Sequence, residues 1–281
     1  MGIRNRLLLT LTLALPALAA PPRILLRCDD IGFCHSVDVA AEGLMDQGLV
    51  FSASVLVPCP WFPEAVAILK KHPATCVGVH LCLTSEWRGY RWQPVLGRDA
   101  VPSLVDAAGY FPESEDAFKA GRPVLAEVER ELRAQIQRAQ QAGLKLDYLD
   151  CHMNIAFSTP ELRAVLEKLA KEFRLGISTG YGENERTLWE VPPRLKKTRL
   201  LAWFKALEPE RVNLFVFHIG RNNDEMKALY DMNNPEDPAR IGQHRGAEYR
   251  ALSSKAFKQA LRDSKATVIT YRDLAAPALN P

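Results

Sequence analysis

The sequence lacks the charge imbalance that is typical of proteins that bind nucleic acid. Its formal net charge is only +3 over 281 residues, and its one dense group of Lys and Arg runs from Arg194 to Arg199. Beyond the first twenty residues, no segment approaches the roughly 20 apolar residues that a transmembrane helix needs. No C-x-x-C motif, Gly/Ser-rich linker or internal repeat occurs either. The sequence therefore argues against a nucleic-acid partner and a transmembrane segment.

What remains is ordinary globular material, 47% apolar and 25% charged, enough for one barrel-sized domain or two small ones. The first 19 residues are predicted to be a signal peptide: Arg4 and Arg6 are positive, residues 7–15 are apolar apart from two threonines, and Ala17-Leu18-Ala19 is a small-x-small cleavage site. We expect cleavage after Ala19, because a cut one residue later would leave Pro21 at the new N-terminus. The predicted mature domain, residues 20–281, would be periplasmic or secreted.

Six cysteines lie in the predicted mature chain: Cys28, Cys34, Cys59, Cys76, Cys82 and Cys151. They are too sparse for a disulfide scaffold, and four lie in or beside expected core strands, where a free cysteine packs as a small hydrophobe. Six cysteines allow 15 connectivities. The sequence leaves open whether any disulfide forms.

Apolar, β-branched runs alternate with segments of helical period along the chain. The expected strands are Arg23 to Cys28, Val50 to Val57, Thr75 to Leu83, Leu144 to Leu149, Leu175 to Ser178, Val212 to Phe217 and Ala266 to Thr270. The expected helices are Val37 to Gln47, Pro63 to Lys71, Val124 to Ala142, Pro160 to Phe173, Leu195 to Leu207 and Ser253 to Asp263, with Ser36 and Thr159 as N-caps. This pattern predicts an α/β fold, most simply a single-domain, TIM-barrel-like (β/α) barrel of seven or eight strands.

A long insertion from Ser85 to Arg122 interrupts this pattern, and its length favours a lid or a binding loop. Aromatic residues gather in or next to the strand-end loops: Trp61, Trp87, Tyr90, Trp92 and Tyr110. Their rings could stack on sugar faces, or they could anchor the loops by burial. As a group they favour a sugar or another flat ligand.

Polar residues end several of the expected strands. Asp29 and Asp30 follow the first strand, and His80, His152 and His218 each lie at the end of a later one. A single histidine on an apolar strand is more often a core or surface residue than a ligand. In a parallel barrel, however, the carboxyl ends of the strands meet on one face, so these side chains are expected to converge.

An aspartate with two histidines suits Zn²⁺ or another divalent cation that accepts nitrogen and oxygen ligands. A second carboxylate beside such a site can take a proton from water, and a further histidine can give one to a leaving group. The convergence therefore predicts a metal-dependent hydrolase.

Five short motifs, in this order, resemble those of the YdjC-like (ChbG/HpnK) carbohydrate deacetylase family. They are Asp29-Asp30-Ile31-Gly32, Gly78-Val79-His80-Leu81 with Leu83-Thr84, Asp150-Cys151-His152, His218-Ile219-Gly220, and Arg245 with Glu248. The resemblance runs from about residue 23 to about residue 275, and it implies a TIM-barrel-like deacetylase that removes N-acetyl groups from amino sugars with one divalent metal ion.

By this resemblance Asp30, His80 and His152 match the family's metal ligands, Asp29 its catalytic base, and His218 the place of a catalytic acid. We expect Zn²⁺ or Mg²⁺ as the metal, an N-acetylated saccharide as the substrate, and the option of a homodimer.

The sequence departs from the family where further histidines are common, at Met153, Asn154 and Ala156, and where Arg27 replaces the usual Asn. These changes affect the substrate more than the metal. Two alternatives remain: a metal-dependent hydrolase of another amide or of a phosphoester, and a non-catalytic exported sugar-binding protein. Retention of both Asp29 and Asp30 argues against the second alternative, because a binding site gains nothing from a carboxylate that binds no metal and repels the carboxylate next to it.

Overall fold

The computed structural model describes residues 20–234, 236–237 and 240–275. The predicted signal peptide, residues 1–19, lies outside these residues. Among the helices described, none is long and apolar enough to cross a membrane.

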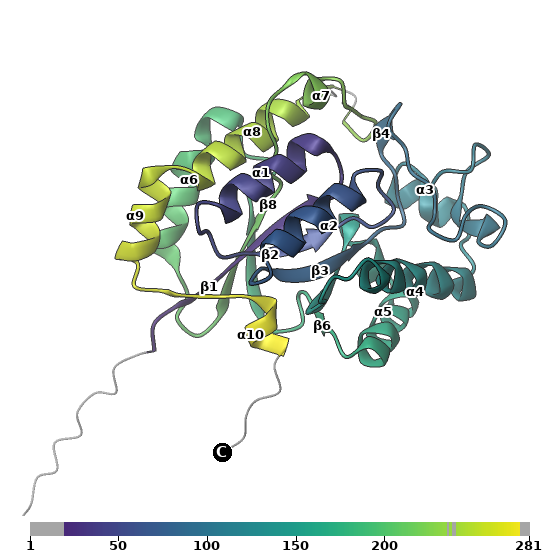
Figure 1. Ribbon diagram of the computed structural model, residues 1–281, viewed down its shortest axis with the longest axis horizontal. Helices are drawn as coiled ribbons and strands as arrows, with labels where there is room; N and C mark the ends of the chain where they lie inside the picture. The colour runs from purple at the N-terminus through teal and green to yellow at the C-terminus, as the bar shows by residue number, and fades with distance from the viewer. Residues whose placement is uncertain (1–19, 235, 238–239, 276–281) are drawn as a thin grey trace, which may run out of the picture.

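The described residues form one α/β domain around a curved, wholly parallel sheet (Figure 1). Its hydrogen-bonded order is β6-β5-β3-β2-β1-β8-β7, and β10 pairs with β1 beside this path. The strands are β1 (Arg23–Ile31), β2 (Ser52–Val55), β3 (Cys76–Leu81), β5 (Tyr148–Cys151), β6 (Gly176–Ile177), β7 (Glu183–Thr187), β8 (Val212–Phe217) and β10 (Thr267–Ile269). The parallel β/α architecture predicted from the sequence is confirmed.

The expectation of a closed TIM-like barrel needs correction. Within the described part of the chain, β6 and β7 are the two edges of the sheet and do not pair with each other. β6 is only two residues long, and β7 carries the polar sequence Glu-Asn-Glu-Arg-Thr. Neither edge supplies the long apolar strand that closure requires, so the sheet stays open as a partial barrel.

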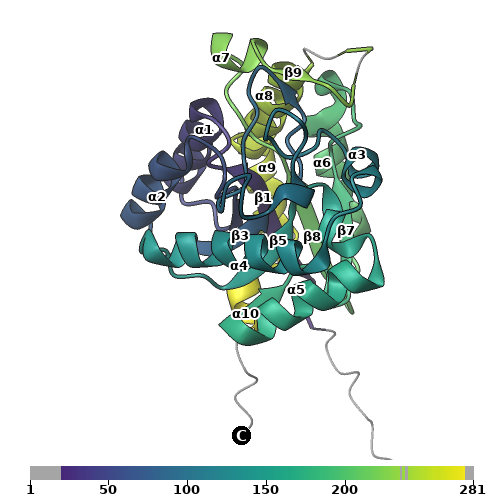
Figure 2. The same ribbon diagram turned by 90° about the vertical axis from the view of Figure 1, so that its right-hand side faces the viewer.

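Helices cover the convex side of the sheet (Figures 1 and 2). The helix α1 packs on β1 and α4 packs on β3, while Figure 2 shows α4 and α5 lying together along one side. The helices are α1 (His35–Met45), α2 (Phe62–Lys71), α3 (Glu115–Ala120), α4 (Leu125–Gln141), α5 (Pro160–Phe173), α6 (Lys196–Trp203), α7 (Asp224–Lys227), α8 (Ile241–Leu252), α9 (Lys255–Asp263) and α10 (Tyr271–Ala275).

Two of the predicted helix starts can be compared directly. Thr159 caps α5 as expected, because its side chain accepts a hydrogen bond from the backbone N–H of Leu162. Ser36 does not cap α1. Cys34 takes that place, and the Ser36 hydroxyl instead donates to Asn223 at 2.7 Å.

The two faces of the sheet bury different side chains, because successive residues of a strand point to opposite faces. In β1, Ile24, Leu26 and Cys28 belong to the main core beneath the helices. Leu25 faces the other way, into a smaller apolar cluster with Tyr148, Leu214 and Val216 among others. This smaller cluster closes the base of the concave face and leaves its carboxyl end for polar residues.

The insertion at residues 85–122 contains α3 and a short strand, β4 (Trp87–Arg88), which pairs antiparallel with β9 (Tyr230–Asp231). Two segments far apart in sequence are thereby joined over the carboxyl end of the sheet. All six cysteines are buried and carry free thiols, so no disulfide contributes to this fold.

Candidate metal and catalytic site

The concave face carries a row of polar residues directly above its apolar base. Arg27 and Asp29 follow Leu25 on the same face of β1. In the same way, Tyr148 of β5 is followed by Asp150 in that strand and by His152 directly after it. In β3, His80 lies opposite Asp150 in the pairing register. Each strand contributes its last side chains on the concave face. These side chains meet because every second residue of a strand points to the same face of the sheet.

Asp30 reaches the same place by a different route. It would point to the outer face if β1 stayed regular, but its φ is +65°, and the pairing with β2 shifts register between Cys28 and Ile31. Such bulges re-aim side chains next to functional sites. Both neighbouring acids therefore face the concave side, and each is only 2% exposed.

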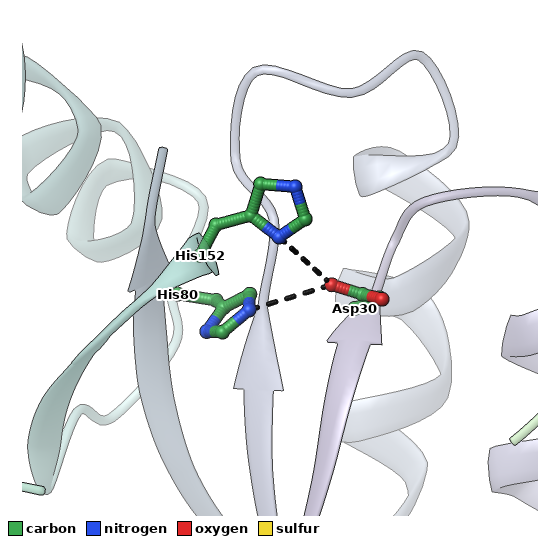
Figure 3. A group of neighbouring side chains, drawn as sticks. All are labelled: Asp30, His80 and His152. Atoms are coloured by element: carbon green, nitrogen blue, oxygen red, sulfur yellow. Dashed lines mark ion pairs between the residues drawn. The ribbon is translucent and has the colours of Figure 1, made fainter. Parts of the chain in front are cut away.

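Asp30, His80 and His152 form a compact group in which both rings face one carboxylate oxygen (Figure 3). Oδ1 of Asp30 lies 3.4 Å from Nε2 of His80 and 3.3 Å from Nδ1 of His152. This oxygen is buried and has no hydrogen-bond partner in good geometry. One carboxylate oxygen and two imidazole nitrogens, converging and unspent, fit a divalent cation with mixed ligands.

The other ring nitrogen of His80 faces Asp150, whose Oδ2 lies 2.7 Å from Nδ1. Asp150 also accepts from the Ser178 hydroxyl and lies 3.1 Å from Arg27. A carboxylate behind a histidine ligand is common in metal sites, because it fixes the tautomer and the ring. Gly78, two residues earlier, makes room for the Tyr148 ring: a Cβ there would lie 2.5 Å from a ring carbon.

His152 is held in the same manner by Glu86, whose two carboxylate oxygens both lie 3.1 Å from Nε2. Glu86 comes from the insertion and is 5% exposed. Burial alone would lower the pKa of both histidines, but Asp29 and Asp150 raise the pKa of His80 to about 9, and Glu86 raises that of His152 well above its ordinary value. A divalent cation bound here would replace the protons that these carboxylates stabilise on the two imidazoles.

Asp29 is bound by Arg27 in a two-point ion pair, with Nε to Oδ1 at 2.8 Å and a terminal nitrogen to Oδ2 at 2.9 Å. The planar guanidinium fixes the plane of the carboxylate. Arg27 thus compensates for two carboxylates, Asp29 and Asp150, in a buried strand.

Arg245 of α8 neutralises the second acid. Its guanidinium lies 2.5 Å from Oδ2 of Asp30 and near the rings of Phe33 and Trp189. Burial alone would raise the pKa of Asp30, but Arg245 and the two histidines hold it well below its usual range. Since Arg245 occupies Oδ2, the other oxygen is left to face the imidazoles.

His218 follows β8 and faces the same cavity from the opposite side. Its backbone N–H donates to Glu248 at 2.7 Å, and Glu248 pairs with the buried Lys196 at 2.6 Å. Its ring packs on Trp189 at 5.0 Å between centroids, and Nδ1 is buried without a partner. Burial lowers the pKa of this imidazole.

All five predicted site residues line one cavity of about 370 Å³, within the size range of small-molecule sites. Of the five aromatic residues in the strand-end loops, Trp87 lines it. Tyr90 instead anchors the insertion through a hydrogen bond from its hydroxyl to the carbonyl of Phe33, and Trp92 is 3% exposed, with its indole N–H donating to Cys82. Burial explains these two aromatics better than ligand stacking.

Sequence reasoning missed several residues that line this cavity, among them Glu86, Trp189 and Glu185. Glu86 lies within a long insertion, Trp189 follows an unpredicted polar strand, and Glu185 is part of that strand. No spacing or period marks them, because their role depends on contacts between distant segments.

The model of the YdjC-like protein family matches residues 23–263. The chain belongs to the YdjC-like family. A Thermus thermophilus protein named carbohydrate deacetylase is 37% identical over 266 residues, covering 85% of this chain and 89% of that protein. Another of that name, from Brevibacillus brevis, is 35% identical over 155 residues, 55% of this chain and 58% of the relative. This YdjC-like chain spans little more than half the length of that relative.

A crystal structure from Enterococcus faecalis, of a protein proposed to act in cellobiose-phosphate cleavage, has the same fold. It superimposes with a TM-score of 0.73 at 22% identity, covering 91% of this chain and 99% of the other. The YdjC-like fold described above is thus shared at a low level of sequence identity.

Proposed function

We propose that this YdjC-like protein is a metal-dependent carbohydrate deacetylase that hydrolyses the acetamide of N-acetylated amino sugars or oligosaccharides. The observation that carries the proposal is the unpartnered Oδ1 of Asp30 between two imidazole nitrogens, in a cavity that Asp29 and His218 also line. The name of the relatives, carbohydrate deacetylase, supports the substrate class.

Asp30, His80 and His152 would hold the metal, Zn²⁺ or Mg²⁺. When bound, a divalent cation supplies Lewis acidity to the acetamide carbonyl and to the attacking water. Asp29 then accepts the proton of that water at a carboxylate that Arg27 keeps oriented. His218, facing the cavity, donates a proton to the departing amine. Trp87 and Trp189 offer ring surfaces to the sugar.

We also propose that the protein acts after export, since residues 1–19 have the positive, apolar and small-residue order of a signal peptide. The substrate would then be an extracytoplasmic saccharide.

The test uses residues 20–281, stripped of metal with a chelator and reloaded with Zn²⁺ or Mg²⁺. Acetate release is measured on mono- and oligosaccharides that carry N-acetyl groups, beside acetylated peptides and p-nitrophenyl phosphate. Metal-dependent acetate release from the saccharides supports the proposal. Turnover of only the peptide or the phosphoester would replace the substrate class, and saccharide binding without turnover would replace the enzyme by a binding protein.

The metal ligands are tested separately by metal content. His80→Ala and His152→Ala should each retain much less metal than the wild type, because either change removes one of three ligands. His35→Ala is the matched control, since His35 pairs with Glu64 outside the cavity. Full metal retention in both cavity variants would exclude this site.

A further inference from the structure

Glu86 is the one carboxylate of the insertion, residues 85–122, that lines the cavity. It lies at the start of that insertion, immediately before β4, and its side chain is 7% exposed. Its backbone carbonyl accepts a hydrogen bond from Met232 at 2.9 Å, next to the pairing of Trp87 with Asp231. Backbone contacts between the insertion and the segment around β9 therefore fix the position of Glu86 independently of its side chain.

The carboxylate of Glu86 contacts the ring nitrogen of His152 that faces away from Asp30. Both of its oxygens lie 3.1 Å from Nε2, whereas Nδ1 lies 3.3 Å from Oδ1 of Asp30. A neutral imidazole carries one N–H, and a carboxylate that accepts at Nε2 keeps the hydrogen there. The lone pair is then left on Nδ1, directed toward Asp30.

The same arrangement exists at His80 with the nitrogens exchanged. Oδ2 of Asp150 lies 2.7 Å from Nδ1, and Nε2 lies toward Asp30. The two orienting carboxylates differ in origin, because Asp150 belongs to the sheet whereas Glu86 belongs to the insertion. The insertion therefore contributes to the chemistry of the site as well as covering it.

We propose that Glu86 is a positioning residue that sets the tautomer and ring orientation of His152, so that the metal site is complete only when the insertion is in place. The inference rests on the proposed metal-dependent function, and it assigns part of that function to a loop. Carboxylates in this position typically contribute 10- to 100-fold in metal affinity or activity.

The experiment measures the Zn²⁺ affinity of residues 20–281 by calorimetry, beside the thermal midpoint of the metal-free protein. Glu86→Ala should weaken Zn²⁺ binding about 10- to 100-fold. Glu86→Gln should recover most of this loss, because its amide oxygen still accepts from Nε2–H. At saturating Zn²⁺ the kcat of Glu86→Ala should return most of the way to that of the wild type, since the catalytic groups are untouched.

Two variants serve as matched controls. Glu64→Ala removes another glutamate whose oxygens both lie 2.9 Å from a histidine, His35, outside the cavity. Arg88→Ala removes a β4 side chain that lies 3.9 Å from the Tyr230 ring, but it leaves the backbone pairing of β4 with β9 and the partners of His152 in place. Both should bind Zn²⁺ as the wild type does.

Equal Zn²⁺ affinity in the wild type and Glu86→Ala would overturn the inference, and so would an equal loss in Arg88→Ala, which would assign the effect to loop stability. A wild-type protein that binds no Zn²⁺ and no Mg²⁺ would overturn the proposed function together with the inference. Loss of affinity confined to Glu86→Ala, with recovery in Glu86→Gln, supports the inference.

Discussion

Replacing Arg245 with methionine should destabilise the metal-free protein strongly, because Arg245 is the direct counter-charge of Asp30. The two side chains are 2% and 3% exposed and meet at 2.5 Å. Methionine keeps an apolar chain of similar length near Phe33 but removes the charge. Asp30 would then be a buried carboxylate without its cation.

Breaking a buried ion pair by removing one partner typically costs about 3–5 kcal/mol. For a domain of this size, 1 kcal/mol changes the thermal midpoint by about 2–4 °C, so the midpoint of Arg245→Met should fall by roughly 6–20 °C. A bound divalent cation would compensate for Asp30 in part. Zn²⁺ should therefore raise the midpoint of Arg245→Met by more than it raises that of the wild type.

The assay is thermal unfolding of both proteins, with a chelator and with saturating Zn²⁺. The double variant Asp30→Asn/Arg245→Met completes a mutant cycle, in which contacting residues show coupling of about 0.5–3 kcal/mol. If Arg245→Met stayed within about 0.5 kcal/mol of the wild type without metal, as is usual for an unimportant surface change, the assigned ion pair would be refuted.

Three further predictions concern single residues. Asp29→Asn should keep the fold and most of the metal but lose about 10²–10⁴-fold in kcat, and wild-type turnover would exclude Asp29 as the base. Burial lowers the pKa of His218. As the acid, His218 should make kcat/KM fall as pH rises through a value below 6.5, and His218→Gln should remove that alkaline limb. An unchanged pH profile would leave His218 with a structural role. Burial raises the pKa of Asp38 to about 8, above its unfolded value of about 3.9, so its contribution to stability is complete below about pH 4 and lost as pH rises through 8. Relative to Asp38→Asn, the wild type should lose about 1.4 kcal/mol per pH unit over that window in urea unfolding, and parallel pH curves would contradict this.

The sequence by itself determined where most of the parallel strands lie along the chain and at which end of them the polar residues gather. Apolar runs of strand length separated by helical periods are sufficient for a β/α architecture, and the ends of such strands are where side chains converge. For this reason Asp29, His80, His152 and His218 could be placed at one edge before any contact was known. The predicted helix at Pro160 to Phe173 matches α5 to the residue, because a capping threonine and a first-turn proline mark its start.

Tertiary structure decided what local patterns do not encode. The strand β7 is polar and forms only by pairing with β8, and α8 has apolar residues without a clear helical stripe, so neither was predicted. Closure of the barrel depends on whether the two edge strands pair, and the sequence of a single segment does not reveal this. The aim of Asp30 depends on a bulge against β2, and the partners of the two histidines come from β5 and from the insertion. The periodicity of a segment can be read from its own sequence, but the charge that neutralises a buried group lies on whichever segment the fold places beside it.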